Sequence, residues 1–309
     1  MRLLHSAKDI RAQFDDPNLV SCAGLVPVMG LAQECDLAGL VAEHLKVTVR
    51  VGANAHLKIP SIVAGMIAGA DCIDDLDVLR HGGMTELFGG VRAPSTLGSF
   101  LRGFSWGNVS QLEAVSRRLL AELAGRTPVL ADAAAMAHLD IDSTQRRVYG
   151  HAKAGAGFGA AKVGGYTLRL RGLNPLLAAV STPTCAPVVV NTRLRGGTAN
   201  SARGAASFAA ESITTARAAG ATGLLIARMD SAFYNGATIA ACRGAGVRFS
   251  VTARMDRKSS RRSPASAKTP GPRSATPTRY STRTSSAGSP TPRSPRSTTP
   301  RSPAGRGVR

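Results

Sequence analysis

The chain has 309 residues, a mass of 31.9 kDa and a formal net charge of +20, which is long enough for two domains and favours a polyanionic partner. Its five cysteines lie singly, with no CxxC pair, so the sequence argues against a zinc knuckle and a disulfide framework. The polar start MRLLHSAKDI and the lack of an apolar run of about 18 residues predict a soluble, intracellular protein.

Residues 1–20 hold few apolar positions and are expected to form a flexible lead, whereas residues 21–128 show helical spacing. Helices are predicted from Leu25 onward and over the ranges 61–70, 72–80, 94–104 and 110–123. Short helices separated by glycine pairs are compatible with a DNA reader of the helix-turn-helix kind. Its phosphate contacts would then be Arg92, Arg102, Arg117 and Arg118. A helical bundle whose arginines are simply solvated explains the same pattern equally well.

A short apolar strand is predicted over 137–144, and it carries two aspartates. Strand side chains alternate between faces, so Asp140 and Asp142 project to one side while Leu139 and Ile141 project to the other. Two neighbouring carboxylates repel unless a cation or a proton separates them, which makes this strand a candidate divalent-metal site. The alternative is that each aspartate forms a turn or caps a helix, as aspartates at strand ends usually do.

The following stretch, 151–165, is rich in glycine but lacks the GK[ST] ending of a phosphate loop. A flexible hairpin connection is predicted there instead, with Lys153 and Lys162 as candidate contacts to a DNA backbone. Residues 166–172 alternate like a half-exposed strand, and residues 186–192 have the apolar run of a buried strand.

Helices and strands then alternate along the chain. The pattern predicts a helix over 205–219, a strand over 223–230 that ends at Asp230, a helix over 234–243 and a fifth strand over 247–253. Three strands joined by hairpins, followed by strands alternating with helices, predict a mixed α/β sheet covered by helices. Carboxylates brought together at one edge of such a sheet suit metal-assisted phosphoryl transfer.

This succession resembles the insertion-sequence transposases that carry a group 1 DDE domain, those of insertion-sequence family 1380. The segments that carry the resemblance are DIDST, GAGFGAAKVGGYTLRLRGLNPL, TRLRGGTANSARGAAS and RMDSAFYNGATIAACRGAGVRFSVTAR, and it covers about residues 25–254. It implies a ribonuclease H-like core in which three acids hold two Mg²⁺ ions. The implied reaction is hydrolysis of DNA at the element's ends, followed by transfer of the freed 3′ hydroxyl into a target.

Carried over by position, the resemblance makes Asp142 and Asp230 the catalytic, metal-binding acids and leaves Asp140 without an assured role. It makes Arg195 and Arg203 candidate contacts to the DNA backbone. The implied partners are the terminal inverted repeats and target DNA, and a homodimer on DNA is one assembly that the resemblance allows. The implied location is the cytoplasm of a bacterium, in association with the nucleoid.

The family pattern breaks near Asp256. Residues 257–309 hold 13 of the 39 Lys and Arg and 9 of the 17 Pro, and they contain no Asp or Glu, so a disordered basic tail is expected. The third acid of the family, a glutamate on a later helix, is therefore missing. Either the tail is a natural arm that binds nucleic acid, or a single insertion or deletion shifted the reading frame of a GC-rich gene. The abrupt change favours the frameshift.

The predicted fold is an incomplete ribonuclease H-like α/β core over 129–256, a mixed sheet with helices. An all-α DNA-binding region precedes it over 21–128, and the basic tail follows over 257–309. The predicted function is a metal-dependent transposase that is inactive in this chain, because one catalytic acid is missing. The alternative is a non-catalytic DNA-binding remnant or regulator of the element. A ribonuclease H-type nuclease with another substrate fits the two aspartates but not the succession of motifs.

Overall fold

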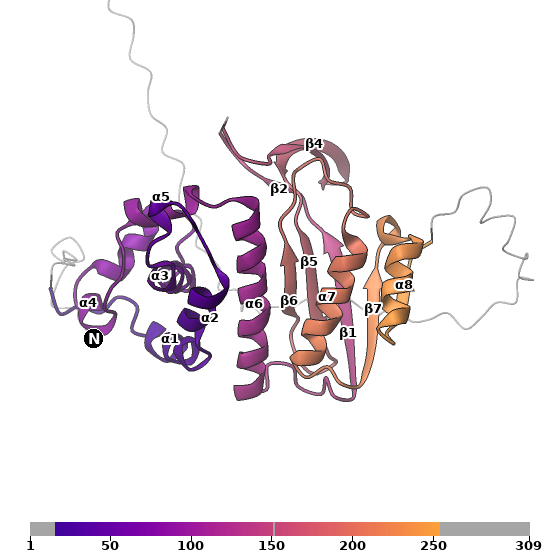
Figure 1. The fold of residues 1–309 in the computed structure, drawn as a ribbon, viewed down its shortest axis with the longest axis horizontal. Coiled ribbons are helices and arrows are strands. Elements are labelled where there is room, and N and C mark those ends of the chain that lie inside the picture. The colour runs from indigo at the N-terminus through magenta and orange to yellow at the C-terminus, as the bar shows by residue number, and fades with distance from the viewer. Residues whose placement is uncertain (1–15, 151, 254–309) are drawn as a thin grey trace, which may run out of the picture. The chain divides into compact units, whose positions relative to one another are not determined.

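A computed structural model describes residues 16–150 and 152–253 (Figure 1). The chain divides at residue 256 into two units, and all described residues belong to the first. The tail predicted over 257–309, and most of the lead predicted over 1–20, therefore lie outside the described residues. Within the first unit, helices come first along the chain, and a mixed sheet with two further long helices follows.

The N-terminal part of the chain is helical, as its apolar spacing predicts. Asp36 caps the second helix, and Ser105 and Asn108 form a capping box at the start of the sixth. Phe100 and Val115 are buried in the core that these helices share. The helices are α1 (Leu25–Glu34), α2 (Leu37–His44), α3 (Ala55–Ile67), α4 (Met84–Leu87), α5 (Pro94–Arg102) and α6 (Trp106–Arg126), with 3-10 helices η1 (Arg50–Gly52) and η2 (Asp74–Arg80).

The segment 72–80 differs from its prediction, because it forms the 3-10 helix η2 and no α-helix. Asp75 explains the difference. Its Oδ2 accepts hydrogen bonds from the backbone N–H groups of Asp71, at 3.2 Å, and Cys72, at 3.0 Å. Such local bonds between side chain and backbone compete with an α-helical start. A hydrogen bond from the Cys72 side chain, together with these two backbone bonds, lowers the pKa of Asp75.

No single described helix is long and apolar enough to cross a membrane. Among the described residues, α1 and α2 taken together meet both requirements, with a bend of 51° between them. Both helices bury apolar side chains in the helical part of the protein, among them Leu25, Leu37 and Val41.

The central sheet has five strands in the order β6-β5-β1-β7-β8. They are β1 (Met136–Ser143), β5 (Leu176–Ser181), β6 (Val188–Arg193), β7 (Leu224–Met229) and β8 (Arg248–Val251). β5 pairs antiparallel with both β1 and β6, whereas β7 pairs parallel with both β1 and β8. Thus β6, β5 and β1 are antiparallel neighbours, and β7 and β8 continue the sheet beyond β1, parallel to it. This is the ribonuclease H-like arrangement, so the predicted α/β fold class is confirmed.

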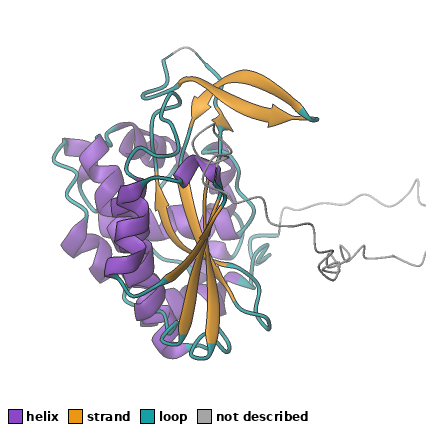
Figure 2. Cartoon of the chain, turned by 90° about the vertical axis from the view of Figure 1, so that its right-hand side faces the viewer, coloured by secondary structure: helices purple, strands orange, loops and turns teal. Residues whose placement is uncertain are grey.

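Two helices, α7 (Ala205–Ala218) and α8 (Gly236–Gly244), lie along one face of this sheet (Figures 1 and 2). Leu139 and Ile141 of β1 and Phe208 of α7 are buried on this side. Within the described ranges, no helix lies over the opposite face of β1 and β7 (Figure 2). On that face Leu224 of β7 is 38% exposed, and Val189 of β6 is 54% exposed.

The connection between β1 and β5 forms a separate three-stranded sheet in the order β2-β4-β3. Its strands are β2 (Arg146–Arg147), β3 (Gly157–Val163) and β4 (Tyr166–Leu173). Two predictions were wrong here. The stretch interpreted as a flexible connection contains β3, and the strand expected to follow β1 in the main sheet is β4 of this smaller sheet. The strand that pairs antiparallel with β1 is β5, which the sequence did not reveal.

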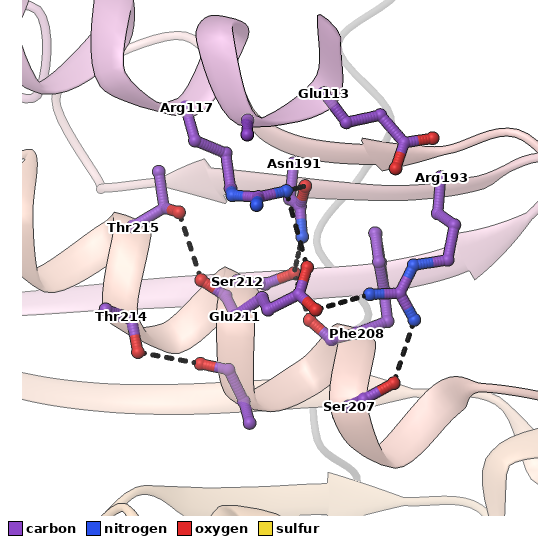
Figure 3. Close-up of polar contacts among 12 residues, drawn as sticks. Glu113, Arg117, Asn191, Arg193, Ser207, Phe208, Glu211, Ser212, Thr214 and Thr215 are labelled. Carbon is purple, nitrogen blue, oxygen red and sulfur yellow. Dashed lines mark hydrogen bonds and ion pairs between the residues drawn. The ribbon is translucent and has the colours of Figure 1, made fainter. Parts of the chain in front are cut away.

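A polar cluster around Glu211 ties α6 to β6 and α7 (Figure 3). Glu211 accepts a hydrogen bond from Arg193 of β6 at 2.7 Å, and its other carboxylate oxygen lies 3.3 Å from Arg117 of α6. Arg117 also donates to Asn191, whose amide donates to Ser212 of α7. The guanidinium of Arg117 is thus held by groups of this chain, in place of the phosphate contact predicted for it.

Candidate functional site

The candidate site lies at the carboxyl end of β1, on the face that no described helix covers. Residues alternate along β1, so that Leu139 and Ile141 are buried under the helices while Asp142 is exposed and Asp140 half-buried. The two aspartates therefore share the open face, as the sequence analysis predicts from strand alternation.

The register of β7 against β1 brings a third aspartate to the same edge. The strands are parallel, and Ile141 lies opposite Met229 in the last pair of the ladder. Asp142 and Asp230 each follow one residue later, and the backbone of Asp230 is still extended. Neighbouring strands lie about 4.8 Å apart, so the two aspartates leave the sheet side by side. Eighty-eight residues of chain separate them in the sequence.

Asp140 is held by a cation on the neighbouring strand. Arg228 lies opposite Asp140 in the ladder and donates two hydrogen bonds to its carboxylate, from Nε to Oδ1 at 2.6 Å and from Nη2 to Oδ2 at 2.5 Å. This bidentate pairing raises the pKa of Arg228. The charge of Asp140 is thereby compensated within the sheet. Asp140 is therefore not open to a cation in the way that Asp142 and Asp230 are.

Asp142 and Asp230 each use one carboxylate oxygen for a local backbone contact. Oδ1 of Asp142 accepts from the N–H of Ser143 at 2.7 Å, and Oδ1 of Asp230 accepts from the N–H of Ala232 at 2.9 Å. Asp230 thereby caps the 3-10 helix η3 (Ser231–Phe233). Helix capping is the alternative role that the sequence suggests for an aspartate at the end of a strand. Both residues are exposed, so their remaining oxygens face solvent and are open to a ligand.

The donor set fits Mg²⁺ in part. Mg²⁺ prefers oxygen ligands, keeps several waters and is commonly held by one or two carboxylates together with substrate phosphates. Asp142 and Asp230 supply such a pair. Over residues 16–150 and 152–253, no group of three or more His, Cys, Asp or Glu side chains is placed to hold a metal ion. The described residues therefore provide two carboxylates of the three that the resemblance implies.

A loop over residues 194–204 lies beside the site, and Arg195 organises it. The Ser143 and Ser201 hydroxyls, 2.7 Å apart, join the end of β1 to this loop. Arg195 is buried, and its guanidinium donates to the carbonyls of Asn174 at 2.9 Å, Asn200 at 2.8 Å and Arg203 at 2.9 Å. Burial lowers the pKa of Arg195. Its donors hold the loop together, and the DNA contact suggested for Arg195 stays a prediction.

The other predicted DNA contacts are dispersed. Arg203 is exposed on the loop beside Asp142, and Lys153 is exposed between β2 and β3. Lys162 lies on β3. Arg92 is half-buried just before α5, and Arg102 at the end of α5 donates to Ser99 at 3.1 Å. Figure 1 shows α5 on the far side of α6 from the sheet, so Arg92 and Arg102 lie apart from the aspartates.

Sequence analysis did not single out Arg228 or Ser201. Arg228 stands two residues before Asp230 in GLLIARMD, as Asp140 stands two residues before Asp142 in HLDIDS. This matched spacing is a signal for a cross-strand pair, but only once the two strands are known to be parallel neighbours in this register. Ser201 carries no such signal, because loop closure sets its contact with Ser143.

Comparison with known proteins identifies one family and finds similar solved structures. A family model described as transposase DDE domain group 1 matches residues 3–286. No curated protein matches the chain. A solved structure described as "Crystal structure of the Mos1 Strand Transfer Complex" is 12% identical, with 62% of this chain and 56% of that chain covered and a TM-score of 0.21. The chain thus spans little more than half of that protein.

Proposed function

The chain belongs to the family of transposases with a group 1 DDE domain, and from this membership we propose that it descends from the transposase of a bacterial insertion sequence. The observation that carries the proposal is the placement of Asp142 and Asp230 at the ends of adjacent parallel strands, on an open face. The substrate would be DNA, as terminal inverted repeats and target, in the bacterial cytoplasm close to the nucleoid.

In this proposal Asp142 and Asp230 hold Mg²⁺ through their solvent-facing oxygens. Mg²⁺, when bound, supplies charge stabilisation to the phosphoryl group and activation of the attacking oxygen. Asp140 and Arg228 keep β1 and β7 in register, so that the two ligands stay adjacent. Arg203 on the loop beside the site, with Lys153 and Lys162 on the smaller sheet, would contact the DNA backbone.

The same proposal holds that this chain does not cleave DNA. A two-metal site with one carboxylate missing binds its second ion weakly and compensates less charge in the transition state. The last acid in the sequence is Asp256, and residues 257–309 supply none. The family match runs on to residue 286, past the change in composition, so the frameshift is supported by composition alone.

Metal binding and cleavage are the direct tests. We expect Mn²⁺, followed by electron paramagnetic resonance, to bind the full chain weakly and to be lost in Asp142→Asn and in Asp230→Asn. We expect no nicking, with Mg²⁺, of duplex DNA that carries the ends of the element. Nicking by the parent chain that disappears in Asp142→Asn would confirm the site and overturn the inactive state. Reading the gene in its other two frames from codon 256 tests the frameshift, which predicts an apolar continuation with a glutamate.

A second candidate function is DNA binding without catalysis, as a remnant or regulator of the element. The observation that favours it is that the described residues offer two open carboxylates, because the third one nearby, Asp140, is engaged by Arg228. In this case the helical region, with Arg92 and Arg102, would bind the inverted repeats. Binding of these repeats that is unchanged by chelation of divalent metal and by Asp142→Asn would favour the regulator, and loss in Arg102→Gln would locate the surface.

A further inference from the structure

The small sheet formed by β2, β3 and β4 carries positive charge without any negative charge. We call residues 146–173 the arm. It contains six Lys and Arg residues and no Asp or Glu. Figures 1 and 2 show it beyond the ends of the central strands, and it begins four residues after Asp142. A segment with this charge, next to two candidate catalytic acids, attracts a polyanion.

The arm also exposes aromatic rings. Tyr149 is 71% exposed and Phe158 is 55% exposed. Both line an open hollow of about 430 Å³, together with the arginines Arg147, Arg169 and Arg171. Exposed apolar groups that are gathered in one place and rimmed by polar side chains mark interaction sites or ligand-binding grooves. A hollow that combines two aromatic rings with three guanidinium groups has the features of a site for a group that is both planar and anionic.

The side chains of the hollow are held in place by contacts within the arm. Phe158 of β3 lies opposite Arg171 of β4, and Arg169 stands two residues away on the same side of that strand. Arg169 donates to the carbonyl of Phe158 at 3.5 Å, and Arg171 donates to the carbonyl of Gly150. The guanidinium of Arg147 lies 4.7 Å from the centre of the Tyr149 ring. Two rings and three guanidinium groups therefore line one space.

We propose that this hollow binds an unpaired nucleotide of a DNA strand, with the base stacked on Phe158 and Tyr149 and the adjoining phosphates bound by Arg147 and Arg169. Aromatic faces combined with a cationic track are the means by which proteins bind single-stranded nucleic acid. The choice of DNA rests on the proposed function. The arm would then take up the strand that becomes unpaired beside Asp142 and Asp230 when a DNA end is opened.

A surface for duplex backbone alone would be built differently. Phosphate oxygens are bound by cations and N–H groups and make no use of exposed aromatic rings. The two surfaces can therefore be distinguished by removing the rings while leaving every charge in place. Both rings are well exposed, so their removal takes little packing from the arm.

The test uses the full chain and a single-stranded oligonucleotide containing 2-aminopurine, whose fluorescence falls when it stacks on an aromatic ring. We expect Phe158→Ala and Tyr149→Ala each to weaken binding roughly 5- to 100-fold and to abolish the quenching. Measurements at raised salt suppress contacts that are purely electrostatic. The matched control is Tyr166→Ala, which removes an exposed ring of β4 outside the hollow and should change neither signal. Phe158→Tyr, which keeps an aromatic ring, should retain both the affinity and the quenching.

Two results would overturn the proposal. One is unchanged affinity and quenching in Phe158→Ala and Tyr149→Ala. The other is an equal loss on duplex DNA of the same sequence, which would make the hollow a part of a backbone surface. The proposed function is tested separately by Asp142→Asn, which should abolish Mn²⁺ binding and leave the quenching intact. If the parent chain quenches the fluorescence but binds no Mn²⁺, the nucleotide site in the hollow is supported and only the proposed metal site is contradicted.

Discussion

At the scale of single residues, the contact between Asp140 and Arg228 decides which carboxylates are open to a cation. Arg228 stands two residues before Asp230, on the same side of β7, and its guanidinium is engaged by Asp140. Without Asp140, the nearest carboxylates for that guanidinium would be Asp142 and Asp230. Asp140 thus keeps a competing cation away from the proposed metal ligands, although it binds no metal itself.

We therefore expect Asp140→Asn to weaken Mn²⁺ binding roughly three- to tenfold, because the freed Arg228 competes for Asp142 and Asp230. The double variant Asp140→Asn with Arg228→Gln should recover the lost affinity, since it removes the competitor as well. Titration of all three proteins with Mn²⁺, followed by electron paramagnetic resonance, measures this coupling. A double variant that binds no better than Asp140→Asn would show that Asp140 acts in some other way.

Glu113 of α6 gives a prediction for the effect of pH. Burial raises the pKa of this carboxyl, against the opposing effects of a hydrogen bond from the N–H of Leu194 and of Arg193 and Arg117 nearby. A carboxyl with a higher pKa in the folded chain binds its proton more tightly when folded. The free energy of unfolding therefore falls as pH rises from the unfolded pKa through the folded one.

Glu113→Gln stays neutral and keeps an acceptor for Leu194, so it should melt at a higher temperature than the parent at pH 7. Its advantage should shrink as the pH falls toward about 4, where the parent carboxyl is protonated in both states. Thermal melts across this range give the measurement, with the exposed Glu122→Gln as control. A difference that does not change with pH would contradict the assigned cause.

At the scale of secondary-structure elements, Glu211 joins three of them. It receives Arg193 from β6 and Arg117 from α6 while lying on α7. Both arginine side chains are largely buried, at 20% and 22% exposure. Replacing Glu211 leaves two guanidinium groups without their carboxylate. This lowers the free energy of unfolding by more than the loss of an exposed ion pair does.

We expect Glu211→Gln to lower the free energy of unfolding by about 1–2 kcal/mol, since the carboxylate is itself partly exposed. Glu122→Gln is the matched control. It breaks an exposed ion pair with Arg126 within α6, and it should cost at most about 0.5 kcal/mol. Urea denaturation of the three proteins measures both values. Equal effects of the two substitutions would mean that the cluster contributes no more than a surface pair.

The elements also show what the sequence could and could not predict. Short apolar runs identified β1 and β7, and alternation predicted the shared face of Asp140 and Asp142, because a strand with one buried face has a period of two. β5 was missed because its sequence LLAAVS has only one β-branched residue, Val180, and directly follows the proline of LNP. β4 alternates clearly, but alternation cannot say which sheet a strand joins. That choice, like the Arg228 contact, depends on pairing between distant segments.

At the scale of the whole molecule, charge is divided unevenly along the chain. Residues 257–309 carry 13 Lys and Arg and no acid, whereas the first 256 residues carry 26 bases against 19 acids. Non-specific DNA affinity depends on the number of phosphates neutralised, and it falls steeply with salt. The basic tail should therefore dominate such binding, whether it is a natural arm or the product of a frameshift.

We expect the affinity of the full chain for an arbitrary duplex to fall by roughly 10³-fold between 50 and 200 mM salt. A chain that ends at residue 256 should show a much shallower dependence and weaker binding at low salt. Fluorescence anisotropy over a salt series yields the two slopes. Identical slopes would place the non-specific contacts on the first 256 residues.

The sheet face that no described helix covers has a consequence for the life of the protein in a cell. It presents Leu224 and Val189 to water, on the same face as the candidate acids. Quality-control machinery recognises apolar surface of this kind, and chaperones and proteases remove chains that display it. The abundance of this protein would then be set by its turnover, and its influence on the genome would depend on how long each copy survives.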